Sequence, residues 1–203
     1  MTMDLKNAYQ ERYTKALKPV ERTLESFVQD HLSHCSRIDR ITARVKEVKS
    51  FLEKADSQEN GKRKYSDPFN QIQDQIGVRV VTFYLMDVEH ISKEVERYFT
   101  PIERQDVVPD TDNEFGYFGK HFVLLIPKDV ITDATQEALL PKFFELQVIT
   151  LYQHAWAQAN HDLAYKPQQM LSTDQKRRIA FTAAQSWGAD MIFEELVRSL
   201  GTE

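Results

Sequence analysis

The sequence predicts an α+β domain in which one mixed β-sheet of about four to five strands is flanked by helices. The middle of the chain holds short runs rich in valine, isoleucine and aromatic residues, separated by polar turns. Both ends of the chain instead show the apolar spacing of helices. With 203 residues, 41% of them hydrophobic and 28% charged, the chain suits a single folded domain over residues 1–203.

Helical extensions are expected at residues 4–33 and 173–200, on either side of a core over residues 41–166. Between Leu5 and Leu32 the apolar side chains line one helical face, and Pro19 should kink this helix or split it in two. Ser172 and Gln175 favour a capping box at the start of the C-terminal helix.

The core is predicted from alternation and from β-branched residues. Ile41, Ala43 and Val45 share one side of a short strand at 41–46, which a helix at 47–55 should follow. Asp87 is placed to cap a helix that runs to about residue 99. The remaining predictions are a mobile loop at 56–67, strands at 76–85, 117–126 and 143–150, a weaker strand after residue 101, and a helix at 151–165.

Composition narrows the class of protein. The net charge of −5 argues against a generic nucleic-acid coat. Residues 36–64 nevertheless hold nine basic and five acidic side chains, a strip that attracts a small polyanion such as a nucleotide but is also typical of a solvated surface. Cys35 is the only cysteine, which favours a reducing cytoplasm. The longest apolar stretch is too short to cross a bilayer, and we expect neither a secretory signal nor a membrane association.

Four polar side chains near residue 50 form the first motif. Arg44 and Lys46 are two residues apart and should share one face of their strand. Ser50 and Lys54 are four apart and should stack on the following helix. Such cations beside a helix start can converge on phosphate groups, although ordinary surface charge produces the same pattern.

Two acidic residues stand at strands that should lie in the same sheet. Asp74 precedes the strand of Gly77 and Arg79, and Glu145 shares a face with Gln147 on a strongly apolar strand. Burying an unpaired carboxylate is costly, and a divalent cation held by Asp74 and Glu145 would offset that cost. A turn aspartate and a buried salt bridge of Glu145 are the plainer alternatives.

Aromatic and histidine side chains form the last motifs. Tyr117 and His121 should share a strand face, where a ring for base stacking meets a hydrogen-bond donor, although packing explains such a pair equally well. His154, His161 and Tyr165 follow one helical stripe. Their spacing is too wide for a zinc site and favours a packing stripe with polar members.

In this order the motifs resemble the RelA/SpoT synthetase family. That family's pattern is R-x-K-x-x-x-S-x-x-x-K, then D-x-x-G-x-R, G-Y-x-x-x-H, E-x-Q-x-x-T, and H-x-x-A-W with a later H and Y-K. The matching residues are Arg44, Lys46, Ser50, Lys54, Asp74, Gly77, Arg79, Gly116, Tyr117, His121, Glu145, Gln147, Thr150, His154, Ala155, Trp156, His161, Tyr165 and Lys166.

The resemblance implies a nucleotidyltransferase-like fold and a pyrophosphokinase that moves the β,γ-pyrophosphate of ATP to the ribose 3′-hydroxyl of GDP or GTP. By the same resemblance, Asp74 and Glu145 would be catalytic and would hold Mg²⁺. ATP would be bound by Arg44, Lys46, Ser50, Lys54 and Arg79. The acceptor would be bound by Tyr117, which stacks on its base, by His121 and by Gln147.

Three departures from the family pattern leave the acceptor open. Phe118 and Ile149 stand where arginine is frequent, and Arg104 is the one basic residue between Pro101 and Gly116. The same chemistry on a tRNA 3′ end or an adenine nucleotide is therefore an alternative, and a catalytically weak nucleotide-binding module is another. The length predicts a small synthetase-only member or an excised domain. A homo-oligomer, and an antitoxin for a toxin-like member, are further possible partners.

Overall fold

A five-stranded mixed sheet forms the centre of the computed structural model, which describes residues 2–109, 111, 114–164 and 171–201. Its strands lie in the order β1-β4-β7-β6-β5, with β4 and β7 parallel and all other neighbours antiparallel. The strands are β1 (Ile38–Val45), β4 (Ile76–Thr82), β7 (Phe143–Thr150), β6 (Gly119–Leu125) and β5 (Pro101–Val107). The predicted α+β class with a mixed sheet is confirmed.

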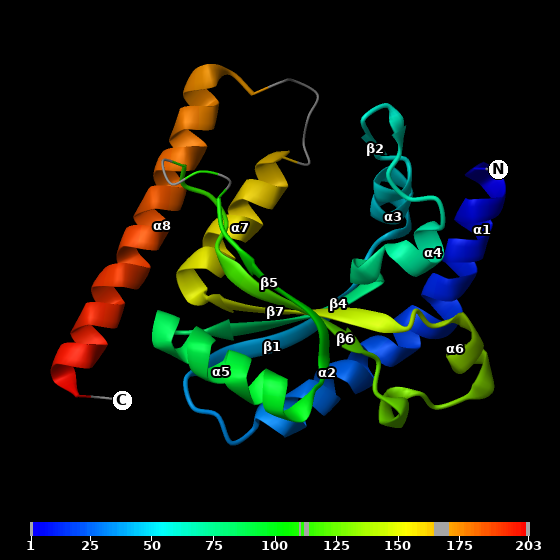
Figure 1. The fold of residues 1–203 in the computed structure, drawn as a ribbon, viewed down its shortest axis with the longest axis horizontal. Helices are drawn as coiled ribbons and strands as arrows, with labels where there is room; N and C mark the ends of the chain where they lie inside the picture. Colours follow the sequence, from blue (N-terminus) through cyan, green and yellow to red (C-terminus); the bar gives the residue numbers. More distant parts are fainter. Residues whose placement is uncertain (1, 110, 112–113, 165–170, 202–203) are drawn as a thin grey trace.

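Helices cover both faces of this sheet (Figure 1). Helices α2 (Lys18–Leu32) and α5 (Leu85–Tyr98) pack on one face, while α3 (Val48–Ala55) and α7 (Leu151–Ala164) lie on the opposite side. The long α8 (Thr173–Leu200) packs beside α7 and α5. The shorter elements are α1 (Thr2–Arg12), η1 (Tyr13–Leu17), α4 (Pro68–Gln71), η2 (Gln73–Gln75), η3 (Lys128–Val130), α6 (Ala134–Leu139), and the hairpin β2 (Gln58–Glu59) and β3 (Lys62–Arg63).

Pro19 interrupts the N-terminal helix as predicted, and it does so through a widened turn. The π-helical segment η1 joins α1 to α2 immediately before it, and the Lys18 N–H donates to the carbonyl of Tyr13, five residues earlier. Proline lacks an N–H and crowds the preceding turn, so a wider turn relieves that crowding. None of the described helices combines the length and apolarity that a membrane span requires.

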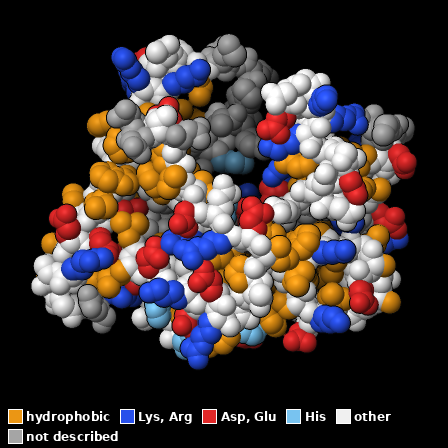
Figure 2. Space-filling view, in the orientation of Figure 1, with side chains coloured by type: hydrophobic (Ala, Val, Ile, Leu, Met, Phe, Trp, Pro, Cys, Tyr) orange, Lys and Arg blue, Asp and Glu red, His pale blue; other side chains and the backbone are white. Residues whose placement is uncertain are grey.

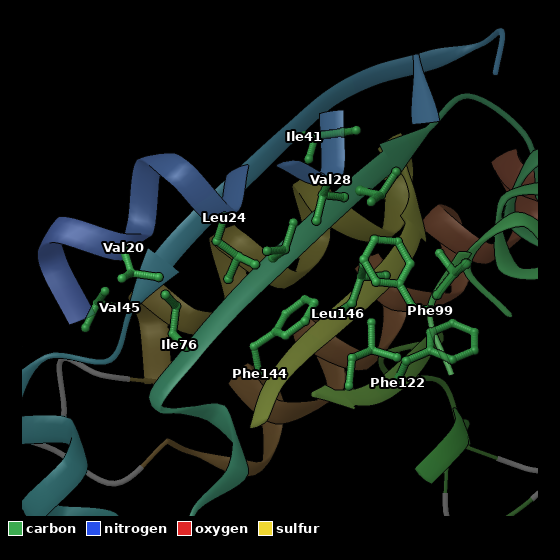
Figure 3. Close-up of a cluster of buried hydrophobic side chains, with 14 of the residues drawn as sticks. Val20, Leu24, Val28, Ile41, Val45, Ile76, Phe99, Phe122, Phe144 and Leu146 are labelled. Carbon is green, nitrogen blue, oxygen red and sulfur yellow. The ribbon is translucent and has the colours of Figure 1, made fainter. Parts of the chain in front are cut away.

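The hydrophobic core lies between α2, α5 and the inward face of the sheet (Figure 3). Val20, Leu24 and Val28 of α2 are fully buried, as their helical spacing predicts. The alternate residues of the strands meet them, and Phe122, Phe144 and Leu146 are also fully buried. Because side chains alternate across a strand, the residues between these core positions face the other side of the sheet. The candidate site lies on that side.

Helix α2 also closes the exposed edge of the sheet. Glu21 and Glu25 accept hydrogen bonds from the backbone N–H groups of Val45 (3.0 Å) and Ala43 (2.7 Å). Gln29, one turn further along, donates to the carbonyl of Ile41 (3.2 Å). Unpaired groups on an edge strand otherwise invite pairing with another chain. These side chains satisfy them and hold β1 in place.

Several predicted boundaries are wrong, and the strand predicted at 41–46 runs over Ile38–Val45 as β1. Strand β4 ends at Thr82, because α5 already begins at Leu85, and Asp87 lies in its first turn where it accepts from the N–H of Tyr84 (3.1 Å). Aspartate is favourable at both positions, so composition alone does not separate them. Strand β6 begins at Gly119, two residues after Tyr117. The predicted loop at 56–67 contains the β2–β3 hairpin, turned by Asn60 and Gly61 at positive φ.

The docking of α8 is unusual because a polar stripe faces inward. Ser186, Asp190 and Glu194 are buried, while Phe181 and Ile192 are more than half exposed, and hydrophobic side chains gather over α8 in Figure 2. The capping box of Ser172 and Gln175 at its start is confirmed. Asp190 Oδ2 accepts from the Thr150 hydroxyl (2.9 Å) and from Gln153 Nε2 (3.3 Å). No described residue donates to its buried Oδ1, and burial raises the pKa of Asp190 to about 6.

This raised pKa predicts a pH-dependent effect of Asp190→Asn on stability. A carboxyl whose folded pKa lies above its ordinary 3.8 contributes stability that is present below pH 3.8 and is lost as the pH rises through about 6. The Asn variant should match the native chain near pH 4 and exceed its free energy of unfolding by about 3 kcal/mol at pH 8. Urea unfolding across this range measures the difference. Asp174→Asn, an exposed change in the same helix, is the control, and a pH-independent effect of Asp190→Asn would contradict the assignment.

Candidate active site

A cleft of about 350 Å³ opens on the face of the sheet opposite the core. Strands β1, β4 and β7 form its floor, and α3 and α7 supply its walls. Figure 2 shows the surface hollowed between the α3 side and the α7–α8 side of the molecule. Among the residues predicted from sequence, Arg44, Lys46, Ser50, Asp74, Gly77, Arg79, Glu145 and Gln147 line this cleft.

Helix α1 supports the side of the cleft where Lys46 and Lys54 lie. Lys46 follows β1 directly, and its carbonyl accepts a hydrogen bond from the Tyr9 hydroxyl (2.8 Å). The Tyr9 ring is fully buried and stacks on Phe51 of α3, with ring centroids 3.7 Å apart. This contact ties the end of β1 to α3, the helix that carries Ser50 and Lys54. The N-terminal extension therefore positions the cations, a role that its apolar spacing did not indicate.

Asp74 lies in the η2 turn just before β4, between two lysines. Its Oδ2 is 2.9 Å from Lys46 Nζ and its Oδ1 is 3.0 Å from Lys54 Nζ. Burial raises the pKa of Asp74, but the two ammonium groups outweigh it and hold the pKa below its ordinary value. Oδ1 is buried and lacks a hydrogen bond of good geometry from any described residue, despite its short distance to Lys54. Lys54 thus joins the site through Asp74.

Glu145 is the centre of a hydrogen-bonded row that crosses three strands. His121 Nδ1 lies 3.0 Å from Oε1, and Gln147 Nε2 donates to Oε2 at 2.7 Å. Arg79 Nε and Nη2 both donate to Gln147 Oε1, at 3.0 and 2.8 Å. Burial raises the pKa of Glu145, but its hydrogen bond with His121 and the attraction of that ring hold the pKa below its ordinary value.

The two carboxylates face a common gap. Gly77 pairs with Glu145 in the parallel β4–β7 ladder, and Asp74 lies three residues before Gly77. The β4 position beside Glu145 therefore carries no side chain. The Asp74 and Glu145 side chains are 25% and 22% exposed, so both remain reachable from the cleft, and the charge of Asp74 acts on Glu145. The two acids thus line one cleft.

Tyr117 reaches the site through His121, its hydroxyl lying 3.1 Å from Nε2. It lies just before β6, so its approach to His121 comes from a bend in the chain and not from a shared strand face. Gly119 makes this bend possible, because a Cβ there would lie 2.7 Å from the Tyr117 hydroxyl. Arg104 is engaged elsewhere, with ion pairs to Glu96 (2.5 Å) and Asp106 (3.8 Å).

The prediction of a packing stripe on α7 is wrong. His154, Gln158 and His161 line the cleft, and His154 Nδ1 lies 3.4 Å from Arg79 Nη1. Burial, followed by the charges of Arg79 and Arg40, lowers the pKa of His154. The spacing of one face was visible in the sequence, but which surface that face meets depends on how α7 crosses the sheet. Tyr165 and Lys166 lie outside the described residues.

The site fits a divalent cation by the chemistry of its donors. Within the described chain, no group of three or more His, Cys, Asp or Glu side chains is arranged to hold a metal alone. Mg²⁺, however, is commonly held by one or two carboxylates together with phosphate oxygens. The buried Oδ1 of Asp74, which lacks a hydrogen bond, and the Glu145 carboxylate are suitable partners for such an ion.

The sheet and this site define an α+β domain that carries a charged cleft on one face of a mixed sheet. The family described as "Region found in RelA / SpoT proteins" matches residues 43–170, and the chain belongs to the RelA/SpoT family. It is 31% identical over 150 residues to GTP pyrophosphokinase YjbM of Bacillus subtilis. That match covers 71% of this chain and 63% of the relative, so the chain matches less than two thirds of the relative's length.

Solved structures show the same fold. Small alarmone synthetase 1 from Bacillus subtilis superposes with a TM-score of 0.72 at 23% identity, covering 96% of this chain and 97% of that one. The same protein bound to its product pppGpp gives a TM-score of 0.74 at 22% identity, with coverages of 94% and 97%. A GTP pyrophosphokinase family protein from Streptococcus pneumoniae gives 0.69 at 21% identity, with coverages of 91% and 92%.

Proposed function

We propose that this chain is a pyrophosphokinase that transfers the β,γ-pyrophosphate of ATP to the ribose 3′-hydroxyl of GDP or GTP. The observation that carries the proposal is the pair Asp74 and Glu145 on one cleft beside Arg44, Lys46 and Lys54. The relative with 31% identity is named a GTP pyrophosphokinase, and a similar structure holds pppGpp as its product. Family membership and the arrangement of charges therefore support the same reaction.

In this reaction the 3′-oxygen of the acceptor forms a bond to the β-phosphorus of ATP. The bond from that phosphorus to the α,β-bridging oxygen breaks, and AMP leaves. Arg44, Lys46 and Lys54 stabilise the charge on the phosphates, as cations do in phosphoryl-type transfer. Glu145 accepts the hydroxyl proton or orients the hydroxyl. Ser50 and Arg79 complete the ATP side in this proposal, and Gln147 belongs to the acceptor side.

Mg²⁺ is the cofactor that we propose for this site. Asp74 and Glu145 would hold it, and when bound it would neutralise phosphate charge during transfer. Without the ion, Lys46 and Lys54 compensate the negative charge of the Asp74 carboxylate. Cytoplasmic location, which the single cysteine favours, is part of the proposal, while a homo-oligomer and an antitoxin stay predictions.

An assay with labelled ATP identifies the acceptor. Purified protein is incubated with ATP, Mg²⁺ and, in separate reactions, GDP, GTP, AMP or deacylated tRNA. We expect label on GDP or GTP. Phe118, Ile149 and the paired Arg104 leave few cations for acceptor phosphates, which favours the tRNA 3′ end as the second candidate. An adenine nucleotide is the further alternative. Label on tRNA alone would overturn the guanine acceptor, and ATP binding without transfer would indicate a binding module.

Tyr117→Ala should raise the acceptor's KM by roughly tenfold and change the KM for ATP little, because a stacked ring contributes about 1–3 kcal/mol per base. Tyr117→Phe is the matched control, since it keeps the ring and removes only the hydroxyl that contacts His121. Initial rates at varied concentrations of each nucleotide provide both constants. Equal changes in the two KM values, or a Phe variant as impaired as the Ala variant, would count against base stacking.

A further inference from the structure

We propose that Gln147 is a positioning residue, whose carboxamide is locked by Arg79 so that it holds the Glu145 carboxylate in place across the cleft. Both polar atoms of the Gln147 side chain make contacts inside the protein, the oxygen with Arg79 and the nitrogen with Glu145. The kinetic consequences rest on the proposed function. The hydrogen bonds that join Arg79, Gln147 and Glu145 are independent of that function.

The direction of every link follows from the donors available. A guanidinium has only N–H donors, so the amide oxygen of Gln147 must face Arg79, which donates to it twice. The amide nitrogen is then turned toward Glu145, to which it donates at 2.7 Å. Without Arg79 the amide could rotate by half a turn and present its oxygen to the carboxylate, where two acceptors would repel each other. Arg79 thus selects the orientation that binds Glu145.

The second oxygen of Glu145 is held from the opposite side. His121 Nδ1 lies 3.0 Å from Oε1, and a carboxylate only accepts, so Nδ1 carries the proton. His121 Nε2 in turn lies 3.1 Å from the Tyr117 hydroxyl. Hydrogen bonds from Gln147 and from His121 therefore both end at Glu145, and each of its carboxylate oxygens accepts one of them.

The register of the sheet explains why Gln147 can act this way. Arg79, Gln147 and His121 stand side by side on β4, β7 and β6. Glu145 lies two residues before Gln147 on the same face, where its β4 neighbour is Gly77. The carboxylate is therefore clamped by Gln147 and His121 and open toward Gly77, the direction of Asp74. Loss of the Gln147 donor frees one oxygen and allows the carboxylate to turn away from that gap.

Gln147→Leu in the full chain tests the proposal in two ways. The first is a ¹³C NMR titration of the glutamate side-chain carboxyls in nucleotide-free protein, with the Glu145 signal assigned by its loss in Glu145→Gln. Because a hydrogen bond to the charged form lowers a carboxyl pKa, the variant should titrate at higher pH than the native chain. The second is steady-state kinetics, where we expect kcat to fall roughly tenfold or more with the KM for ATP within about twofold. In a plot of kcat against pH, the rise on the acid side should move to higher pH.

Gln136→Leu is the matched control, because it removes a buried glutamine that accepts hydrogen bonds outside the cleft. It should leave the Glu145 titration and the acid-side rise of kcat unchanged. Arg79→Leu should itself shift the titration, and adding Gln147→Leu to it should shift it little further. A native Glu145 titration in Gln147→Leu, or additive shifts in the double variant, would overturn the positioning role. If the native chain transfers label to no acceptor, the proposed function fails while the NMR titration still decides the role of Gln147.

Discussion

Replacement of Glu145 by alanine is expected to lower kcat by at least about a hundredfold while the fold is retained. The carboxylate is reachable from the cleft, lies beside the gap at Gly77, and is held there by His121 and Gln147. Its lowered pKa keeps it charged throughout the neutral range, so its charge is available to the reaction at every working pH. Transfer of label from ATP, with circular dichroism and thermal unfolding as checks on the fold, measures the effect.

Glu145→Gln separates the charge from the shape. The amide keeps one oxygen for the His121 hydrogen bond and has the same size, but it neither attracts a cation nor accepts a proton readily. We expect it to lose nearly as much activity as the alanine variant. A glutamine variant close to native activity would show that Glu145 only shapes the cleft, and an active alanine variant would remove it from the site.

Asp74→Ala should also cost at least about a hundredfold in kcat, with a different effect on binding. In the native chain the carboxylate compensates Lys46 and Lys54 at 2.9 and 3.0 Å. Its removal leaves both ammonium groups free to attract phosphate, so the affinity for ATP without divalent cations should be retained or increased. Turnover should nevertheless be lost, because the carboxylate that would hold Mg²⁺ is gone. Calorimetric titration of ATP in a chelator, beside the transfer assay, measures the two effects separately.

Glu53→Ala is the control for Asp74, since it removes an acid from the neighbouring α3 that pairs with Lys49 outside the cleft. Glu53→Ala should change neither kcat nor the affinity for ATP appreciably. If Asp74→Ala weakened ATP binding and turnover to the same extent, the residue would be a structural partner of the lysines. Activity near the native level would exclude Asp74 from the metal site.

Elements with a strong local pattern were predicted well. Strand β7 and helix α8 have the predicted bounds, because eight residues of Phe143–Thr150 and the Ser172 capping box are local signals. The boundaries at Asp87 and Tyr117 were wrong, since the first turn of α5 is held by a hydrogen bond from the Met86 N–H to Glu194 and Gly119 packs closely against Ile149, both distant in sequence. Short elements such as η2, which carries Asp74, have too little pattern to be predicted.

The types of residue at the site were visible in the sequence, whereas their partners were not. Asp74 and Glu145 were paired by chemical reasoning and the family resemblance, but the lysine clamp on Asp74 depends on where α3 lies against β4. The face of α7 that lines the cleft was wrongly predicted to be a packing stripe, because its position also depends on how distant elements pack. Tyr9 of α1 gave only an apolar signal, and its hydrogen bond to the Lys46 carbonyl spans 37 residues.

The amino-acid pattern alone sets which side chains share a face, because the repeats of a strand and a helix act over a few residues. It thereby specified the apolar core of α2, the cations near Lys46 and the pair Glu145 and Gln147. The insertion of β7 between β4 and β6, which brings Arg79, Gln147 and His121 into one row, arises in the folded sheet. Strand order depends on pairing between distant segments, and no local repeat encodes it.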